Sequence, residues 1–153
     1  MFMRTLTAAT LALSLAVPIV IISNPVFAAE PSVVSEPIKV VYHVNEGVQQ
    51  ASRAIGNIRN HLNAAPGTKI VVVTHGSGID FLLDGAENAA GAPFAPSISE
   101  LKSLGVDFRV CNNTLVSRKI DPKSVVSEAS IVPSGVAEVA KLQAREGFVY
   151  LKP

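Results

Sequence analysis

The chain contains a single cysteine, Cys111, in 153 residues. It therefore cannot form an intramolecular disulfide. In an oxidising compartment, a leftover thiol indicates either intermolecular pairing or chemical reactivity. The alternative is a buried and inert side chain, since free cysteine is among the residue types most often buried. The cysteine count alone leaves both interpretations open.

The chain also lacks an excess of charge of either sign. It has 13 basic and 12 acidic side chains, and the numbers become equal once an N-terminal segment containing Arg4 is removed. The sequence thus offers neither the basic field expected of a nucleic-acid-binding protein nor a polybasic membrane patch. We expect no nucleic-acid partner.

Several motifs of catalysis and cofactor binding are absent from the sequence. There is no Gly-x-Ser-x-Gly nucleophile elbow, no P-loop with its lysine and no Gly-x-Gly-x-x-Gly fingerprint. No closely spaced pair of metal ligands occurs either, so we predict no cofactor and no metal site. A zinc site made of His43, His75 and Cys111 is the remaining metal alternative, because zinc accepts nitrogen and sulfur ligands.

The N-terminal segment is typical of an export signal. Arg4 precedes a long apolar run, and small residues follow, so we predict cleavage after Ala28, or as a second choice after Ala29. An uncleaved anchor helix is the alternative. With residues 1–28 as a signal peptide and 29–37 as a tether, one domain remains at 38–153. We expect a periplasmic or secreted protein without stable membrane insertion after signal removal.

Short β-rich runs alternate with helical patterns from residue 38 onward. Strands are predicted at 38–44, 69–76, 106–111, 129–133 and 148–153. Helices are predicted at 45–62, 77–85, 97–105, 112–119, 121–126 and 134–147, with N-caps at Asn45, at Ser97 or Ser99, at Asn112 or Asn113, at Asp121 and at Ser134. Continuous apolar strands joined by helices are typical of a parallel sheet covered on both faces. The sequence predicts an α/β fold with three layers, α/β/α, around a mainly parallel five-stranded sheet.

Three potentially reactive side chains lie at the carboxyl ends of predicted strands, where such sheets bind ligands. They are His43, His75 and Cys111. Cys111 also precedes a predicted helix, whose unpaired N–H groups would lower the pKa of a thiol. Asn112, Asn113 and Thr114 could add amides and a hydroxyl for a bound anion. These features favour a reactive Cys111 over an inert one.

Two neighbouring features have a functional and a structural interpretation. The turn Gly76-Ser77-Gly78 could cradle an anion with its backbone N–H groups, or its glycines could serve only to turn the chain. His43 could assist proton transfer together with His75, or be a half-buried histidine bonded to backbone. The third histidine, His61, is interpreted as a surface residue near a helix end.

Four stretches of the sequence resemble the DsrE/DsrF-like sulfur-relay family, specifically its small single-cysteine branch with exported members. They are VVYHV, VVVTHGSG, LKSLGVDFRVCNNTL and IVPSGVAEVAKLQAREGFVYLKP. Together they span the chain from about Lys39 to Pro153.

The resemblance implies a three-layer α/β/α fold in a homo-oligomer, often a trimer or a multiple of one. It also implies that Cys111 carries sulfur as a persulfide. Characterised relay members are largely cytoplasmic, whereas this chain has an export signal. We therefore expect an exported sulfur carrier or sulfurtransferase that works with sulfane-sulfur donors and acceptors, either proteins or small molecules. The alternative is a non-catalytic oligomeric module that binds a small anion or a metal, with a structural or redox-sensing cysteine.

Overall fold

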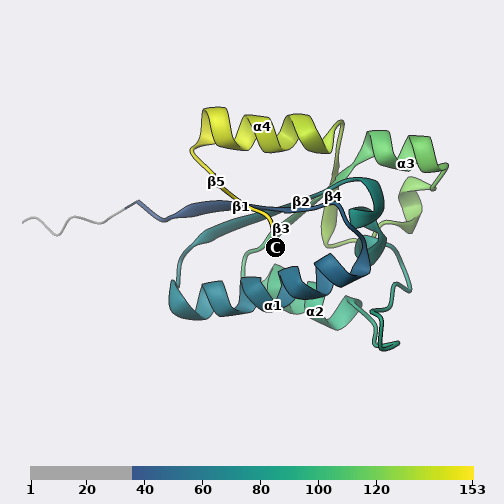
Figure 1. Cartoon of the computed structure of the whole chain (residues 1–153), viewed down its shortest axis with the longest axis horizontal. Helices are drawn as coiled ribbons and strands as arrows, with labels where there is room; N and C mark the ends of the chain where they lie inside the picture. The colour runs from purple at the N-terminus through teal and green to yellow at the C-terminus, as the bar shows by residue number, and fades with distance from the viewer. Residues whose placement is uncertain (1–35) are drawn as a thin grey trace, which may run out of the picture. The chain divides into compact units, whose positions relative to one another are not determined.

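The computed structural model describes residues 36–153, which form a five-stranded parallel sheet with helices on both faces (Figure 1). The strands are β1 (Lys39–Val44), β2 (Lys69–Thr74), β3 (Asp107–Cys111), β4 (Ala129–Val132) and β5 (Val149–Leu151). Their order in the sheet is β4-β3-β2-β1-β5, and every neighbouring pair is parallel. The predicted α/β fold is confirmed, with a sheet that is wholly rather than mainly parallel.

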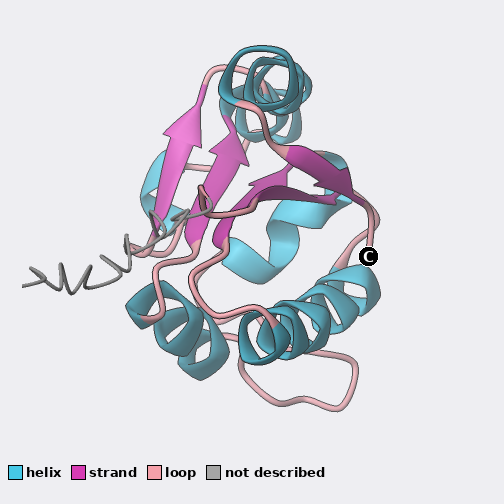
Figure 2. Ribbon diagram, turned by 90° about the vertical axis from the view of Figure 1, so that its left-hand side faces the viewer, coloured by secondary structure: helices cyan, strands magenta, loops and turns pink. Residues whose placement is uncertain are grey.

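The helices cover the two faces of this sheet unequally. Helices α1 (Val48–Ala64) and α2 (Ala95–Ser103) lie on one face, and α4 (Gly135–Glu146) lies on the other (Figures 1 and 2). Helix α3 (Asn112–Arg118) follows β3 directly, and two short 3-10 segments, η1 (Gly76–Leu82) and η2 (Pro122–Ser124), complete the elements.

Each sheet face carries its own apolar cluster, because side chains alternate between the faces along a strand. The larger cluster joins β1, β2 and β3 to α1, α2 and η1. The smaller cluster lies under α4 and consists of Val41, Val71, Val73, Val139, Leu142 and Phe148. Burial on both faces explains why the strands read as continuous apolar runs in the sequence.

The start of α1 differs from the prediction, and a buried glutamine explains the difference. Asn45 is not the N-cap; the helix begins at Val48 after Gly47. Gln50 is fully buried, and its Oε1 accepts the backbone N–H groups of Asn45 and Glu46 at 2.7 and 2.8 Å. These two residues therefore stay outside the helix.

Helix α2 also begins earlier than predicted. It starts at Ala95 after Phe94, so neither Ser97 nor Ser99 is its cap. Pro96 lies in the first turn, where the missing N–H of proline costs nothing, and the Phe94 ring is buried in the larger cluster.

Two predicted caps are confirmed. The Asp121 side chain accepts the N–H of Lys123 at 2.9 Å, although it starts a 3-10 turn rather than an α-helix. Ser134 caps α4 by accepting the N–H of Ala137 at 3.5 Å, and Gly147 ends that helix in the left-handed conformation.

The predicted signal peptide at 1–28 and most of the tether at 29–37 lie outside the described residues. Within residues 36–153, none of the helices has the length and apolar character needed to cross a membrane.

Candidate functional site

The three reactive side chains predicted from the strand ends lie on one side of the sheet. Thr74 of β2 pairs with Val110 of β3, and His75 and Cys111 are the residues that follow this pair. Both therefore point to the sheet face that α4 covers. His43, at the end of β1, contacts His75 directly, so the two imidazoles and the thiol belong to one site.

Gly135, the first residue of α4, lies between His75 and Cys111. A Cβ atom at Gly135 would come within 3.1 Å of the His75 Cβ and 3.2 Å of the Cys111 Cβ. Such distances are tighter than nearly all real Cβ contacts, so only glycine lets α4 begin this close to the strand ends. Gly135 was not predicted as a site residue. A glycine in the first turn of a helix could have indicated a close approach of the backbone there.

The Cys111 thiol is buried, with 4% of the residue exposed. Burial raises the pKa of this thiol, but the backbone N–H groups of Gly135, Thr114 and Asn113 and the Thr114 hydroxyl outweigh it and hold the pKa below its usual range. The thiol makes no capping hydrogen bond in the structure. These donors lower the pKa of the thiol because they interact far more strongly with a negatively charged thiolate than with a neutral thiol.

Cys111 is itself the N-cap of α3, which corrects the prediction that Asn112 or Asn113 caps this helix. The two asparagines are the first helical residues. Asn113 is exposed, and it reaches the thiol through its backbone N–H rather than its side-chain amide. The cysteine stands where a capping oxygen usually stands, so its sulfur faces the N–H groups of the first turn, of which that of Asn113 is also donated to the Pro133 carbonyl at 3.3 Å.

Thr114 links the cysteine to the turn after β2. Its Oγ1 accepts the backbone N–H of Gly76 at 3.0 Å, which leaves the hydroxyl hydrogen free to be donated to Cys111. Thr114 is 8% exposed and is therefore part of the buried wall of the site.

In the turn Gly76-Ser77-Gly78, the N–H groups of both glycines donate to acceptors within the protein. The N–H of Gly76 is donated to Thr114, and that of Gly78 to the carbonyl of His75 at 3.0 Å. The Ser77 hydroxyl is donated to the carbonyl of Asn45 at 3.3 Å. A Cβ at Gly78 would lie 2.1 Å from the Val44 carbonyl oxygen. The N–H groups of Gly76 and Gly78 thus already have acceptors within the protein.

His43 and His75 form a direct imidazole pair. Their Nε2 atoms are 2.7 Å apart, and the Nδ1 of His43 lies 2.8 Å from the hydroxyl of Tyr150. Burial lowers the pKa of both histidines; for His43 the neighbouring His75 and Lys152 lower it further, while Glu46 opposes them. The lowered pKa values favour the neutral form of both imidazoles, in which one Nε2 donates to the other.

Tyr150 is a site residue that sequence reasoning missed. It lies on β5, which pairs with β1 although the two strands are at opposite ends of the domain sequence. Only the strand order reveals this proximity, and no local motif marks it. His61 was expected at the surface, but it is half-buried and its Nδ1 lies 3.0 Å from the Tyr42 hydroxyl.

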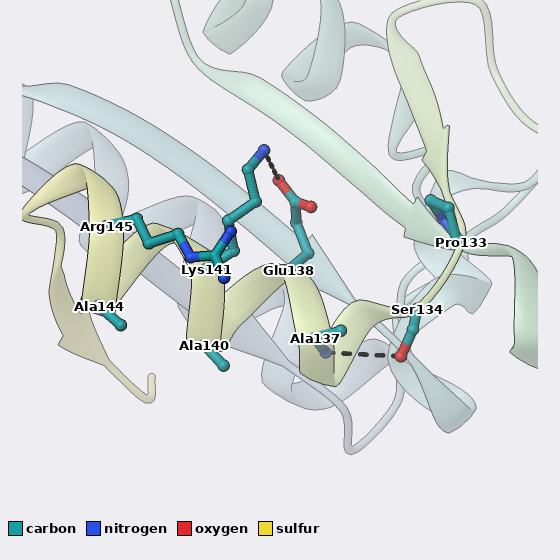
Figure 3. A pocket seen from close by; sticks show the side chains of 8 residues that line it. All are labelled: Pro133, Ser134, Ala137, Glu138, Ala140, Lys141, Ala144 and Arg145. Atoms are coloured by element: carbon teal, nitrogen blue, oxygen red, sulfur yellow. Dashed lines mark hydrogen bonds and ion pairs between the residues drawn. The ribbon is translucent and has the colours of Figure 1, made fainter.

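A hollow on the exposed side of α4 lies apart from this site. Figure 3 shows it between Pro133 and Arg145, with Ala137, Ala140 and Ala144 along the helix. Neither the thiol nor either imidazole lines it. Among residues 36–153, no group of three or more His, Cys, Asp and Glu side chains could hold a metal ion.

Comparison with known proteins identifies the family. The model of the DsrE/DsrF-like family matches residues 38–153. A comparison with curated protein sequences gives no match. Among solved structures, the chain is similar to MTH1491 from Methanobacterium thermoautotrophicum, a protein of unknown function. The identity is 28% and the TM-score 0.68, and the match covers 76% of this chain and 99% of that one.

The ychN protein from E. coli shares the fold, with a TM-score of 0.63 at 12% identity over 76% of this chain and 99% of its own. The family match extends over the whole domain that carries the site. The chain therefore belongs to the DsrE/DsrF-like family, which is associated with sulfur relay.

Proposed function

We propose that this DsrE/DsrF-like protein is an exported sulfur carrier, or sulfurtransferase-like protein, that accepts sulfane sulfur on Cys111 as a persulfide. The observation that carries the proposal is the surroundings of the thiol. Two helix starts and the Thr114 hydroxyl direct donors toward it and lower its pKa. A thiolate is the nucleophile that this chemistry requires.

In the proposed reaction, the Cys111 thiolate attacks the outer sulfur of a donor R–S–SH. A new S–S bond forms on Cys111, the S–S bond of the donor breaks, and its electron pair leaves with R–S⁻. The products are Cys111–S–SH and R–S⁻, so no external oxidant or reductant is needed. The same N–H groups that stabilise the thiolate would stabilise the terminal sulfur of a deprotonated persulfide.

The burial of Cys111 favours small donors. With 4% of the residue exposed, a bulky donor cannot bring its sulfur to the thiol without moving α3 or α4. Polysulfide, thiosulfate and low-molecular-weight persulfides meet this steric limit. A protein donor would have to present its persulfide on a protruding segment.

His75 and His43 are assigned to proton handling. Within the described residues no hydrogen bond joins His75 to the thiol, so the donors around Cys111, rather than a histidine base, explain its lowered pKa. His75 lies next to Cys111 across Gly135. From there an imidazole could protonate the leaving sulfur or bind its anion.

Export and assembly belong to the same proposal. The N-terminal residues 1–28 support a periplasmic or secreted location after cleavage. The family resemblance supports a homo-oligomer, a trimer or a multiple of one. N-terminal sequencing of the exported protein would test the first point, with Ala29 as the expected start. Light scattering would test the second.

Intact-protein mass spectrometry after exposure to polysulfide tests the central proposal. We expect a gain of one or more sulfur atoms that is absent in Cys111→Ser and reversed by a thiol reductant. If the protein gains no sulfur under conditions that load a control persulfide carrier, the proposal fails. Bound metal or a bound anion would then favour the alternative of a non-catalytic binding module.

A further inference from the structure

We propose that Tyr150 is a positioning residue of this site, and that the row Tyr150–His43–His75 conducts a proton between the site and the exposed edge of the sheet. The inference rests on the proposed function, because it assigns this proton to the sulfur that leaves during transfer.

The geometry of the row is continuous. The Tyr150 hydroxyl lies 2.8 Å from His43 Nδ1, and His43 Nε2 lies 2.7 Å from His75 Nε2. The three residues come from β5, β1 and the end of β2, which are adjacent in the sheet order. Successive members are thus within hydrogen-bond distance across three neighbouring strands.

The row leads from a half-buried position beside the thiol to a more exposed one at the edge of the sheet. His75 lies beside buried Cys111 and below the start of α4, whereas Tyr150 is 38% exposed on an edge strand. The His43–His75 contact is partly buried, and the His43–Tyr150 contact is exposed. Protons can therefore be exchanged with water at the tyrosine, the more exposed end of the row, while the histidine next to the thiol is half-buried.

Two tautomeric arrangements are available to the row. In one, the Tyr150 hydroxyl donates to His43 Nδ1, His43 Nε2–H donates to His75 Nε2, and His75 carries its hydrogen on Nδ1. In the other, every hydrogen bond is reversed. A phenol hydroxyl can donate or accept, so it supports both arrangements, and switching between them moves one proton along the row.

The surrounding charges are compatible with this role. Burial lowers the pKa of both histidines and so favours their neutral forms. The charged groups that act on His43 are Lys152 and Glu46, which form an ion pair with each other. Because they oppose each other, neither locks the pair in a protonated state.

The proposed step balances as follows. When the donor S–S bond breaks, R–S⁻ takes a proton from His75 and leaves as R–SH. His75 regains a proton from His43, His43 from Tyr150, and Tyr150 from water, which is left as hydroxide and is neutralised by the buffer at the exposed edge. No direct hydrogen bond joins Cys111 to His75 within residues 36–153, and a donor lies between them only when the Gly135 end of α4 moves aside.

Tyr150→Phe tests the inference, with Tyr42→Phe as the matched control. Tyr42 is the other tyrosine of the chain, and its hydroxyl also contacts the Nδ1 of a histidine, His61, away from the site. Both variants lose one hydroxyl beside an imidazole. Only Tyr150→Phe interrupts the row.

The decisive readout compares two donors with different leaving groups. Sulfite leaving from thiosulfate is a weak base and gains little from protonation, whereas an alkyl thiolate is more basic and leaves faster when it is protonated. We expect Tyr150→Phe to slow loading from an alkyl persulfide by about tenfold or more, a part of the roughly 10²–10⁴-fold that acid catalysis contributes, and to leave loading from thiosulfate unchanged. Equal rates for wild type and Tyr150→Phe with both donors would overturn the inference.

A second readout does not depend on sulfur transfer. Nitrogen-15 spectra of the imidazoles report which nitrogen of His43 and His75 carries hydrogen. We expect Tyr150→Phe to change the tautomer populations of both histidines, and Tyr42→Phe to leave them as in the wild type. If wild-type protein is never loaded, the proposed function fails, while unchanged tautomers in Tyr150→Phe would overturn the row itself.

Discussion

The backbone N–H of Gly135 faces the thiol of Cys111. Gly135 is the first residue of α4, and Cys111 is the N-cap of α3, so the start of α4 stabilises the thiolate at the start of α3. Cys111 comes immediately before α3, and Gly135 begins α4. Two helix starts thus meet at one sulfur atom. Each contributes N–H groups that have no partner within their own helix.

Gly135→Ala is expected to weaken this arrangement. The added methyl would come within 3.2 Å of both His75 and Cys111 side chains and push α4 outward. We expect a higher thiol pKa, slower alkylation by iodoacetamide at pH 7, and a loss of about 1–3 kcal/mol of stability from overpacking.

Gly56→Ala is the matched control, because Gly56 lies within α1 and an added Cβ would meet nothing within 4 Å. It should stabilise the protein by about 0.5–1 kcal/mol and leave alkylation unchanged. If Gly135→Ala alkylates as fast as wild type, the N–H of Gly135 does not control the thiol.

Thr114→Val should separate the contribution of the hydroxyl from that of the helix starts. The substitution keeps the shape of the side chain but leaves the N–H of Gly76 without its acceptor. We expect a higher pKa of the Cys111 thiol, and a loss of stability of about 1–3 kcal/mol from the unsatisfied group. The pH dependence of alkylation and urea denaturation measure the two effects.

Thr68→Val controls for the loss of a buried hydroxyl elsewhere. Thr68 is 9% exposed and donates to the carbonyl of Ala65 at 2.8 Å, at the far end of α1. It should alter stability without moving the alkylation profile. An unchanged pH dependence of alkylation in Thr114→Val would show that the hydroxyl does not affect the reactivity of the thiol.

The stability of the protein should depend on pH through the two imidazoles. Because the pKa values of His43 and His75 are lowered on folding, the unfolded chain binds more protons. The free energy of unfolding should therefore fall as the pH is lowered below about 6.5, the usual histidine value, and level off below the folded pKa values.

Urea denaturation at several pH values between 5 and 7.5, about the interval in which histidine titrates, measures this effect. The double variant His43→Gln/His75→Gln should show a flatter dependence there. Carboxylates with lowered pKa values, such as Glu100 and Glu128, act nearer their usual value of 4.5 and below it. An equally steep dependence in the double variant would show that other groups cause the effect.

Gln50 should prove to be a buried anchor for the end of β1. Its Nε2 donates to the His43 carbonyl at 3.4 Å, and its Oε1 accepts the N–H groups of Asn45 and Glu46. Gln50→Leu would leave these groups unpaired, at a cost of about 1–3 kcal/mol for each buried one. Thermal unfolding measures the loss.

Gln49→Leu provides the comparison, because the side chain of Gln49, next to Gln50 in the sequence, is exposed. It should change stability little. If Gln50→Leu is as stable as Gln49→Leu, the end of β1 is held by the sheet alone.

The positions of His43, His75 and Cys111 could be predicted because they depend on strand ends, which apolar runs mark clearly. A parallel sheet then brings those ends to one side. The caps near the site were predicted less well. Asn112 and Asn113 are good capping residues by type, but the strand continues to Cys111, and the thiol takes the capping position itself.

Tyr150 could not be predicted for a different reason. Its contact with His43 joins residues 107 positions apart, and it exists only because β5 pairs with β1. Local patterns identify strands but do not order them in a sheet. The same limit applies to Gly135, whose neighbours come from β2 and β3.

The wide sequence separation of these contacts has a consequence for the order of events during folding. Contacts between distant segments form late, because long loops must close first. Before α4 reaches the ends of β2 and β3, Cys111 lacks the N–H of Gly135 and titrates closer to a free thiol, near about 8.5. A chain that is still folding therefore carries an accessible but mostly protonated cysteine, and completion of the fold buries this thiol and favours its ionised form.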